Sequence, residues 1–174
     1  MKAPDDRYEH LLEELSISYR ATGAYRQLLA AGSDALPSVR AGLRHANADV
    51  RYRCCRFLDR FLEPEIVADL IAMLDDPDPR VRNTTLHTLA CDRCKEGDCR
   101  PEEKHVLPRA LALLAGDPDR HVRAMAVEVV GQFVHKSPAA IDALQTAAKA
   151  DLAPTVRKKA AWYAPGGAIY RRTA

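Results

Sequence analysis

The dipeptide Val-Arg recurs four times in this chain, and its spacing constrains the fold more than any other feature of the sequence. Its copies begin at Val50, Val81, Val122 and Val156, at intervals of 31, 41 and 34 residues. An apolar run ends in a polar turn before each copy, and small or apolar residues follow each copy at helical spacing. A period in the thirties that joins a turn to a helical stripe predicts a stack of helical hairpins.

The second helix of each predicted hairpin has a clear buried face. Small or apolar residues stand four, five, seven and eight positions after each Val: Cys54, Cys55, Phe57 and Leu58; Thr85, Leu86, Thr88 and Leu89; Ala126, Val127, Val129 and Val130; Ala160, Ala161, Tyr163 and Ala164. The small residue at the fourth position predicts that the two helices of a hairpin approach closely. Because one hairpin cannot cover its own apolar faces, neighbouring hairpins must stack.

The turns before the second helices carry start signals. We expect these helices to begin near four residues: Asp49, Pro79, Asp119 and Pro154. Aspartates at four positions are expected to cap the helices or to interact with the helix dipole: Asp49, Asp78, Asp119 and Asp151.

The whole pattern resembles the HEAT repeat family, most closely in the segment LDDPDPRVRNTTLHTLA, residues 74–90. The resemblance implies an all-α fold, a right-handed α-solenoid in one domain. Residues 36–164 would form about four hairpins, residues 1–35 N-terminal capping helices, and residues 165–174 a tail. It also implies that the arginine after each Val pairs with a turn aspartate of a neighbouring unit, which gives a structural role to Arg51, Arg82, Arg123 and Arg157.

The resemblance further implies that the second helices line a concave face. Positions two, six and ten after each Val should then point outward, which makes partner-binding candidates of Tyr52, Arg56, Arg60, Asn83, Glu128, Lys158 and Trp162. This mixture favours a protein or peptide partner over nucleic acid, which would need cations repeated along the face. Two alternatives stay open: the arginines of residues 51–60 could be a solvated face, and Trp162 could cover the last hairpin.

A cysteine-rich insertion, residues 91–101, accounts for the 41-residue interval. Its ligand pattern consists of His87, Cys91, Cys94 and Cys99, with His105 in reserve. His87 and Cys91 are one helical turn apart, and soft nitrogen and sulfur ligands suit tetrahedral Zn²⁺. Structural zinc, reduced thiols with a packing role, a redox-active Cys91–Cys94 pair and an iron–sulfur centre all remain open. Cys54 and Cys55 fall on the buried stripe and are predicted to be core residues.

The remaining sequence excludes several classes. Five cysteines and a net charge of +2 argue against a disulfide framework and a strong electrostatic field. No apolar run has the length of a membrane span and no signal peptide is present, so a cytoplasmic protein is expected. No known catalytic motif stands out. The expected function is therefore a non-enzymatic scaffold that binds a partner protein. The alternative is a HEAT-like protein acting on DNA, as alkylpurine glycosylases do, or on a bilin chromophore, as bilin lyases do. The identity of the partner and the oligomeric state stay open.

Overall fold

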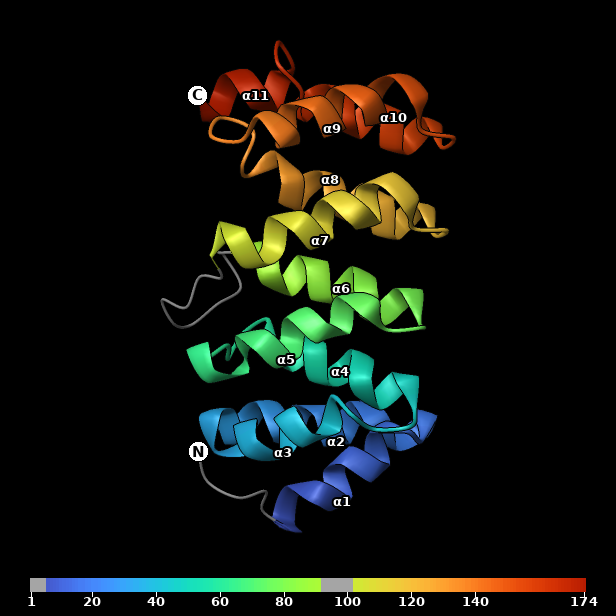
Figure 1. The fold of residues 1–174 in the computed structure, drawn as a ribbon. Coiled ribbons are helices and arrows are strands. Elements are labelled where there is room, and N and C mark those ends of the chain that lie inside the picture. Colours follow the sequence, from blue (N-terminus) through green and yellow to red (C-terminus); the bar gives the residue numbers. More distant parts are fainter. Residues whose placement is uncertain (1–5, 92–101) are drawn as a thin grey trace. The chain divides into compact units, whose positions relative to one another are not determined.

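The computed structural model describes residues 6–91 and 102–174, and this part of the chain contains helices and no strand (Figure 1). The chain divides into two compact units, residues 1–100 and residues 101–174. The single domain expected from the sequence stays a prediction. The helical fold agrees with the expected all-α class.

The first unit contains three helical hairpins that stack in chain order (Figure 1). Their helices are α1 (Asp6–Leu15) with α2 (Ser18–Ala31), α3 (Leu36–Gly42) with α4 (Ala48–Leu58), and α5 (Val67–Ala72) with α6 (Pro79–Ala90). Short 3₁₀ turns η1 (Gly32–Ala35), η2 (Pro64–Ile66) and η3 (Met73–Asp75) adjoin α3 and α5. The predicted capping helices are thus a hairpin of their own, and α1 packs on α3 and α4.

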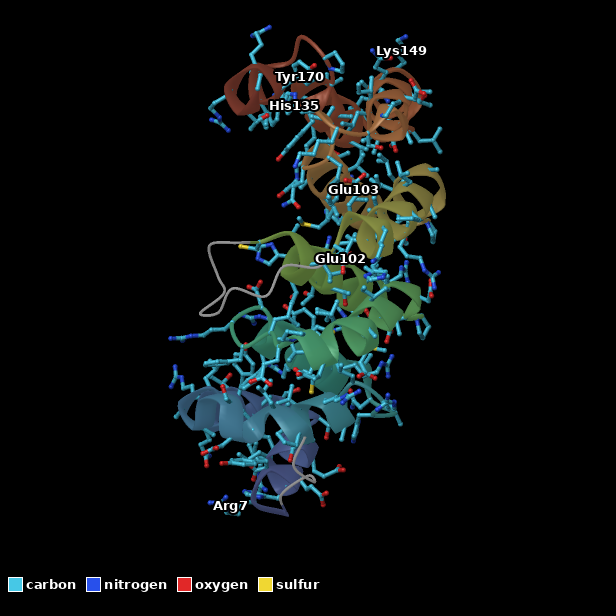
Figure 2. All side chains as sticks on the ribbon, turned by 60° about the vertical axis from the view of Figure 1, so that its left-hand side comes forward. Arg7, Glu102, Glu103, His135, Lys149 and Tyr170 are labelled. Atoms are coloured by element: carbon cyan, nitrogen blue, oxygen red, sulfur yellow. The ribbon has the colours of Figure 1, made fainter. Side chains whose placement is uncertain are left out.

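The second unit contains two hairpins and a short terminal helix. These are α7 (Glu103–Gly116) with α8 (Arg120–Gly131), α9 (Pro138–Ala150) with α10 (Pro154–Tyr163), and α11 (Ala168–Thr173). α11 packs on α10, and the ring centres of His135 and Tyr170 are 4.5 Å apart. Figure 2 shows these two side chains next to each other. The tail therefore folds back on its own unit.

The buried face of the second helices follows the sequence stripe. All twelve stripe residues of α4, α6 and α8 are buried. In α10, Ala160 and Ala164 are buried, Tyr163 is half-buried, and Ala161 is exposed, contrary to the pattern. Burial raises the pKa of the Cys54 thiol, and it raises that of Cys55 to about 12. Both cysteines are therefore protonated core residues, as predicted.

Close helix approach depends on two glycines. A Cβ atom at Gly42 in α3 would lie 2.6 Å from Cys54 Sγ in α4, the small residue at the fourth position of the stripe. A Cβ atom at Gly131 in α8 would lie 2.1 Å from the ring of Tyr163 in α10. Both distances are too short for a real contact, so each helix pair requires a residue without a side chain.

The helix starts agree with prediction, but the caps differ at two positions. The second helices begin at Ala48, Pro79, Arg120 and Pro154, and Asp78 and Asp119 cap theirs. The cap of α4 is Asn47, whose side chain accepts the N–H of Asp49 at 2.8 Å. Asp49 lies in the first turn of α4, which agrees with the expected interaction with the helix dipole, and it also pairs with Arg80 Nη1 at 2.8 Å. Asp151 lies two residues before the cap of α10, which is Ala153.

Candidate functional site

Each Val-Arg arginine is bound to backbone carbonyls of the turn before it. Arg82 Nη1 donates to the carbonyls of Asp76 and Pro77, and Arg157 Nη1 donates to those of Asp151 and Leu152. Arg51 and Arg123 make the same pair of bonds in their own turns. One guanidinium nitrogen of every such arginine is therefore used to close a turn.

Two of these arginines also form a bidentate ion pair with the aspartate of the next turn. Arg51 Nε and Nη2 lie 2.6 and 2.9 Å from the Asp76 carboxylate. Arg123 Nε and Nη2 lie 2.8 and 3.0 Å from the Asp151 carboxylate. The same carboxylates accept the backbone N–H of Asp78 and Ala153, each at 2.8 Å. One aspartate thus orders its own turn and joins it to the preceding hairpin.

These contacts shift the pKa values of the paired groups and favour their charged forms. The hydrogen bond from Arg123 holds the pKa of Asp151 below its ordinary value, and the bond to Asp76 raises the pKa of Arg51. The guanidinium donors of Arg51 and Arg123 are therefore used in contacts within the protein. The structural role of the four arginines in stability stays a prediction.

A candidate metal-binding cluster lies where α4 ends beside α6. One ligand atom each of Asp59, His87 and Cys91 lie within 4.8 Å of one another, and His87 Nε2 is 3.4 Å from Asp59 Oδ2. Asp59 and Cys91 are the C-cap residues that directly follow α4 and α6. The structure therefore brings together two of the predicted ligands and adds a carboxylate. Cys94 and Cys99 lie outside the described residues, and the role of both as ligands stays a prediction.

Aromatic rings and arginines of α2 and α4 lie together and are partly exposed. We call this group the Tyr–Arg patch and define it as Tyr25, Tyr52, Arg53 and Arg56. The Arg56 guanidinium lies 5.4 Å from the ring centre of Tyr25 and 5.8 Å from that of Tyr52, within the range of cation–π attraction. Burial raises the pKa of Tyr25, so its hydroxyl keeps its proton at neutral pH. Two of the predicted partner-binding residues, Tyr52 and Arg56, thus lie together with Tyr25.

The other partner-binding candidates lie on second helices of the two units or, for Arg60, just after one. In α10, Trp162 is 43% exposed and Lys158 Nζ lies 5.5 Å from its ring centre. Glu128 in α8 is paired with Lys159. In the first unit, Arg60 is exposed and its guanidinium lies 5.5 Å from the ring centre of Phe61, while Asn83 is half-buried in α6. The partner-binding role of all seven candidates stays a prediction.

Among the described residues, two shallow clefts lie between first helices of neighbouring hairpins. One of about 320 Å³ is lined by Leu111, Leu114, Thr146 and other residues of α7 and α9. Another of about 320 Å³ lies between α1 and α3 and contains His10 and His45. Neither contains a predicted partner-binding or metal-binding residue. No helix in the described part of the chain is long and apolar enough to cross a membrane.

Comparison with known proteins decides the family. A family model of HEAT repeats matches residues 36–99 and 99–164, which is most of the chain. The chain belongs to the HEAT repeat family. No curated protein matches its sequence.

Solved structures with a similar fold have little sequence identity to this HEAT protein. A chain in the structure of the complex of CpcE and CpcF of phycocyanin lyase from Nostoc sp. PCC7120 is similar with a TM-score of 0.71 and 18% identity. The match covers 90% of this chain and 96% of that chain. The crystal structure of an engineered protein is similar with a TM-score of 0.53 and 19% identity, over 90% of this chain and 77% of that one. At these identities the likeness shows the fold alone.

Counting positions from the Val of each repeat shows two residues whose roles the sequence analysis did not predict, Asp59 and His45. Asp59 stands nine positions after Val50, and His87 and Cys91 stand six and ten positions after Val81, so neighbouring second helices bring them together. His45 occupies the place of the turn aspartate in its repeat, and its Nδ1 accepts the N–H of Asn47 at 3.0 Å. Aligning the repeats position by position is the signal that could have found the role of His45, whereas the meeting of Asp59 with His87 and Cys91 depends on how the helices pack.

Proposed function

We propose that this HEAT protein is a scaffold that binds an acidic segment of a partner protein, with the Tyr–Arg patch as its main contact. The observation that carries the proposal is the state of Arg56. Its guanidinium is exposed and held by two tyrosine rings, and no carboxylate in the described part of the chain forms an ion pair with it. An arginine held in place in this way keeps its hydrogen-bond donors available for a carboxylate of a partner.

The surroundings of Arg56 support the same chemistry. Arg53 lies one turn before it, and its Nε is buried without a hydrogen-bond partner among the described residues. A buried donor without an acceptor costs free energy that an incoming carboxylate would recover. Tyrosine and arginine are also the residue types that dominate binding energy at protein interfaces. Two cations and two phenol rings on one surface therefore favour an acidic protein segment with apolar or aromatic neighbours.

Nucleic acid is a poorer fit to these surfaces. In α8 the positions equivalent to Tyr52, Arg56 and Arg60 are Ala124, Glu128 and Gln132. A phosphate backbone would need cations at successive positions, because each neutralised phosphate adds to the affinity.

The proposal is tested by affinity purification from extracts of the source cells, with cross-linking and mass spectrometry. The wild-type chain is expected to return a defined partner with an acidic segment cross-linked near α2 and α4. The Arg56→Ala variant should bind that partner roughly 30-fold more weakly, the equivalent of the 2 kcal/mol that defines an interface hot spot. Arg120→Ala, which removes an exposed arginine of α8, is the matched control and should bind normally. Equal recovery with Arg56→Ala, or cross-links confined to other helices, would contradict the proposal.

A second candidate is supported by the fold comparison. The similar chain belongs to a complex of two proteins of a phycocyanin lyase, so this chain could be one subunit of an enzyme that handles a bilin chromophore. Absorption spectroscopy distinguishes the two candidates. A red-shifted, stoichiometric bilin complex that forms with the purified chain would favour the lyase-like function, and an unchanged bilin spectrum would favour the scaffold.

A further inference from the structure

We propose that Asp59, His87 and Cys91 form a binding site for a transition metal of the Zn²⁺ type. The site differs from the ligand set expected from the sequence because it includes a carboxylate from a different hairpin. It also differs from the proposed partner contact, and it does not depend on that proposal. The three ligand atoms lie within 4.8 Å of one another.

The geometry is close to that of a tetrahedral metal centre. Bonds of about 2.0–2.3 Å to oxygen, nitrogen and sulfur place neighbouring ligand atoms of Zn²⁺ roughly 3.3–3.8 Å apart. The 3.4 Å between His87 Nε2 and Asp59 Oδ2 lies in this range and is longer than an ordinary hydrogen bond. An adjustment of roughly 1 Å would bring the most distant pair of ligand atoms into the same range.

The backbone around the site is well braced. The N–H of Cys91 donates to the carbonyl of His87 at 2.8 Å, which fixes the two ligands of α6 relative to each other. α4 and α6 are joined by the Thr88 hydroxyl, which donates to the Cys55 carbonyl at 3.1 Å. The ligands therefore come from two helices whose separation is set by a buried contact, and such rigid support favours metal binding.

Asp59 carries a second observation that points to a ligand. Its side chain is 18% exposed, and its Oδ1 atom is buried without a hydrogen-bond partner among the described residues. A carboxylate oxygen removed from water without a donor is costly, and a bound cation would compensate for it. The histidine side chain is 46% exposed, so an ion can enter from solvent on that side.

The donor types select the class of ion. One thiolate, one imidazole and one carboxylate match the ligands of Zn²⁺ and of Co²⁺, which replaces it in such sites, and they do not match the all-oxygen preference of Ca²⁺ or Mg²⁺. Three protein ligands leave one tetrahedral position for water or another ligand.

The test uses the full chain, freed of metal and kept reduced, and titrates it with Co²⁺ and then with Zn²⁺. We expect one ion per chain and a thiolate-to-cobalt charge-transfer band that Zn²⁺ abolishes. Asp59→Asn, His87→Ala and Cys91→Ser should each weaken binding by more than the roughly 10–100-fold that the loss of an outer-shell partner costs. The matched controls are Asp142→Asn and His121→Ala, which remove exposed groups of the second unit and should bind as the wild type does.

The Asp59→Asn variant separates this site from a purely cysteine and histidine set. Normal metal binding by this variant would overturn the proposal, and so would the absence of stoichiometric binding by the folded wild-type chain. If a variant does not fold, the proposal can still be tested on the wild-type chain by measuring how fast Cys91 is alkylated. One equivalent of Zn²⁺ should slow the alkylation of Cys91 at least tenfold, and an unchanged rate would overturn the proposal.

Discussion

Single residues of the turns carry much of the connection between hairpins. Asp151 accepts the Ala153 N–H and two bonds from Arg123, and both members of this ion pair are largely buried. The loss of either member leaves the other buried without a partner, so removal costs more than the net value of the pair.

We therefore expect Arg123→Ala to lower the free energy of unfolding by about 1–3 kcal/mol. Arg82→Ala should have an effect of the same size, because Arg82 is buried and closes its own turn with two carbonyl bonds. Urea unfolding followed by circular dichroism measures both. The exposed Arg120→Ala is the control and should change stability by less than about 0.5 kcal/mol. Unchanged stability of Arg123→Ala, with partner binding lost, would give this arginine a binding role instead.

The Asp151 pair also makes stability depend on pH. In the folded chain, the hydrogen bond from Arg123 lowers the pKa of the Asp151 carboxyl from its ordinary value of 3.8. The ion pair therefore contributes its full stabilisation when the pH is above the pKa of Asp151 in the unfolded chain. This stabilisation is lost as the pH falls through the lower pKa of Asp151 in the folded chain. Asp151→Asn should be less stable than the wild type at pH 7, and the difference should shrink as pH is lowered toward 3. Urea unfolding at both pH values measures this, and a difference that does not depend on pH would contradict it.

At the scale of helices, packing distance decides which substitutions are tolerated. Gly131 lets α8 approach Tyr163 of α10, whereas Gly23 in the middle of α2 has open space where a Cβ atom would lie. Alanine favours the helical conformation over glycine at both positions, so intrinsic propensity predicts stabilisation in both cases. The local contacts predict opposite outcomes.

Gly131→Ala should lower the free energy of unfolding by about 1–3 kcal/mol, because the new methyl group forces the Tyr163 ring to move. Gly23→Ala should raise it by about 0.5–1 kcal/mol, because nothing opposes the gain in helix propensity. Thermal and urea unfolding of the two variants side by side tests the pair. A stabilised Gly131→Ala would show that the ring moves at little cost.

At the scale of the whole molecule, each unit has its own core and each hairpin depends on its neighbour. In the second unit α8 packs on α10 and α7 packs on α9, so the last hairpin covers apolar surface of the one before it. Repeat proteins of this kind gain stability from contacts between neighbouring repeats.

Deleting residues 137–174 should uncover the buried face of α8 and make the chain prone to aggregation. The truncated chain should bind a hydrophobic dye and elute from size-exclusion chromatography partly as aggregates. Deleting residues 1–5, which precede α1, is the control. A truncated chain that stays monomeric, binds no dye and unfolds at the wild-type urea concentration would contradict this dependence on neighbours.

The sequence by itself determined the repeat, the helical secondary structure and the buried face of each second helix. Period and polarity are local properties, so Cys54, Leu86 and Val127 could be assigned to the core before any contact was known. The same reasoning placed His87 beside Cys91, because residues four apart share one face of a helix. Local pattern was less reliable for the caps, where Asn47 rather than Asp49 accepts the N–H group at the start of α4.

Only the tertiary structure decided which residues from different hairpins meet. Asp59 lies 28 positions before His87, as the two numbers show, and no local rule joins them. The same holds for Tyr25 and Arg56, which come from α2 and α4. Stacking distance and helix rotation determine such meetings, and both depend on contacts between helices, such as the hydrogen bond from Thr88 of α6 to the Cys55 carbonyl of α4. The proposed metal-binding cluster and the Tyr–Arg patch therefore result from helix packing, whereas the period of the sequence determines the repeat framework that carries them.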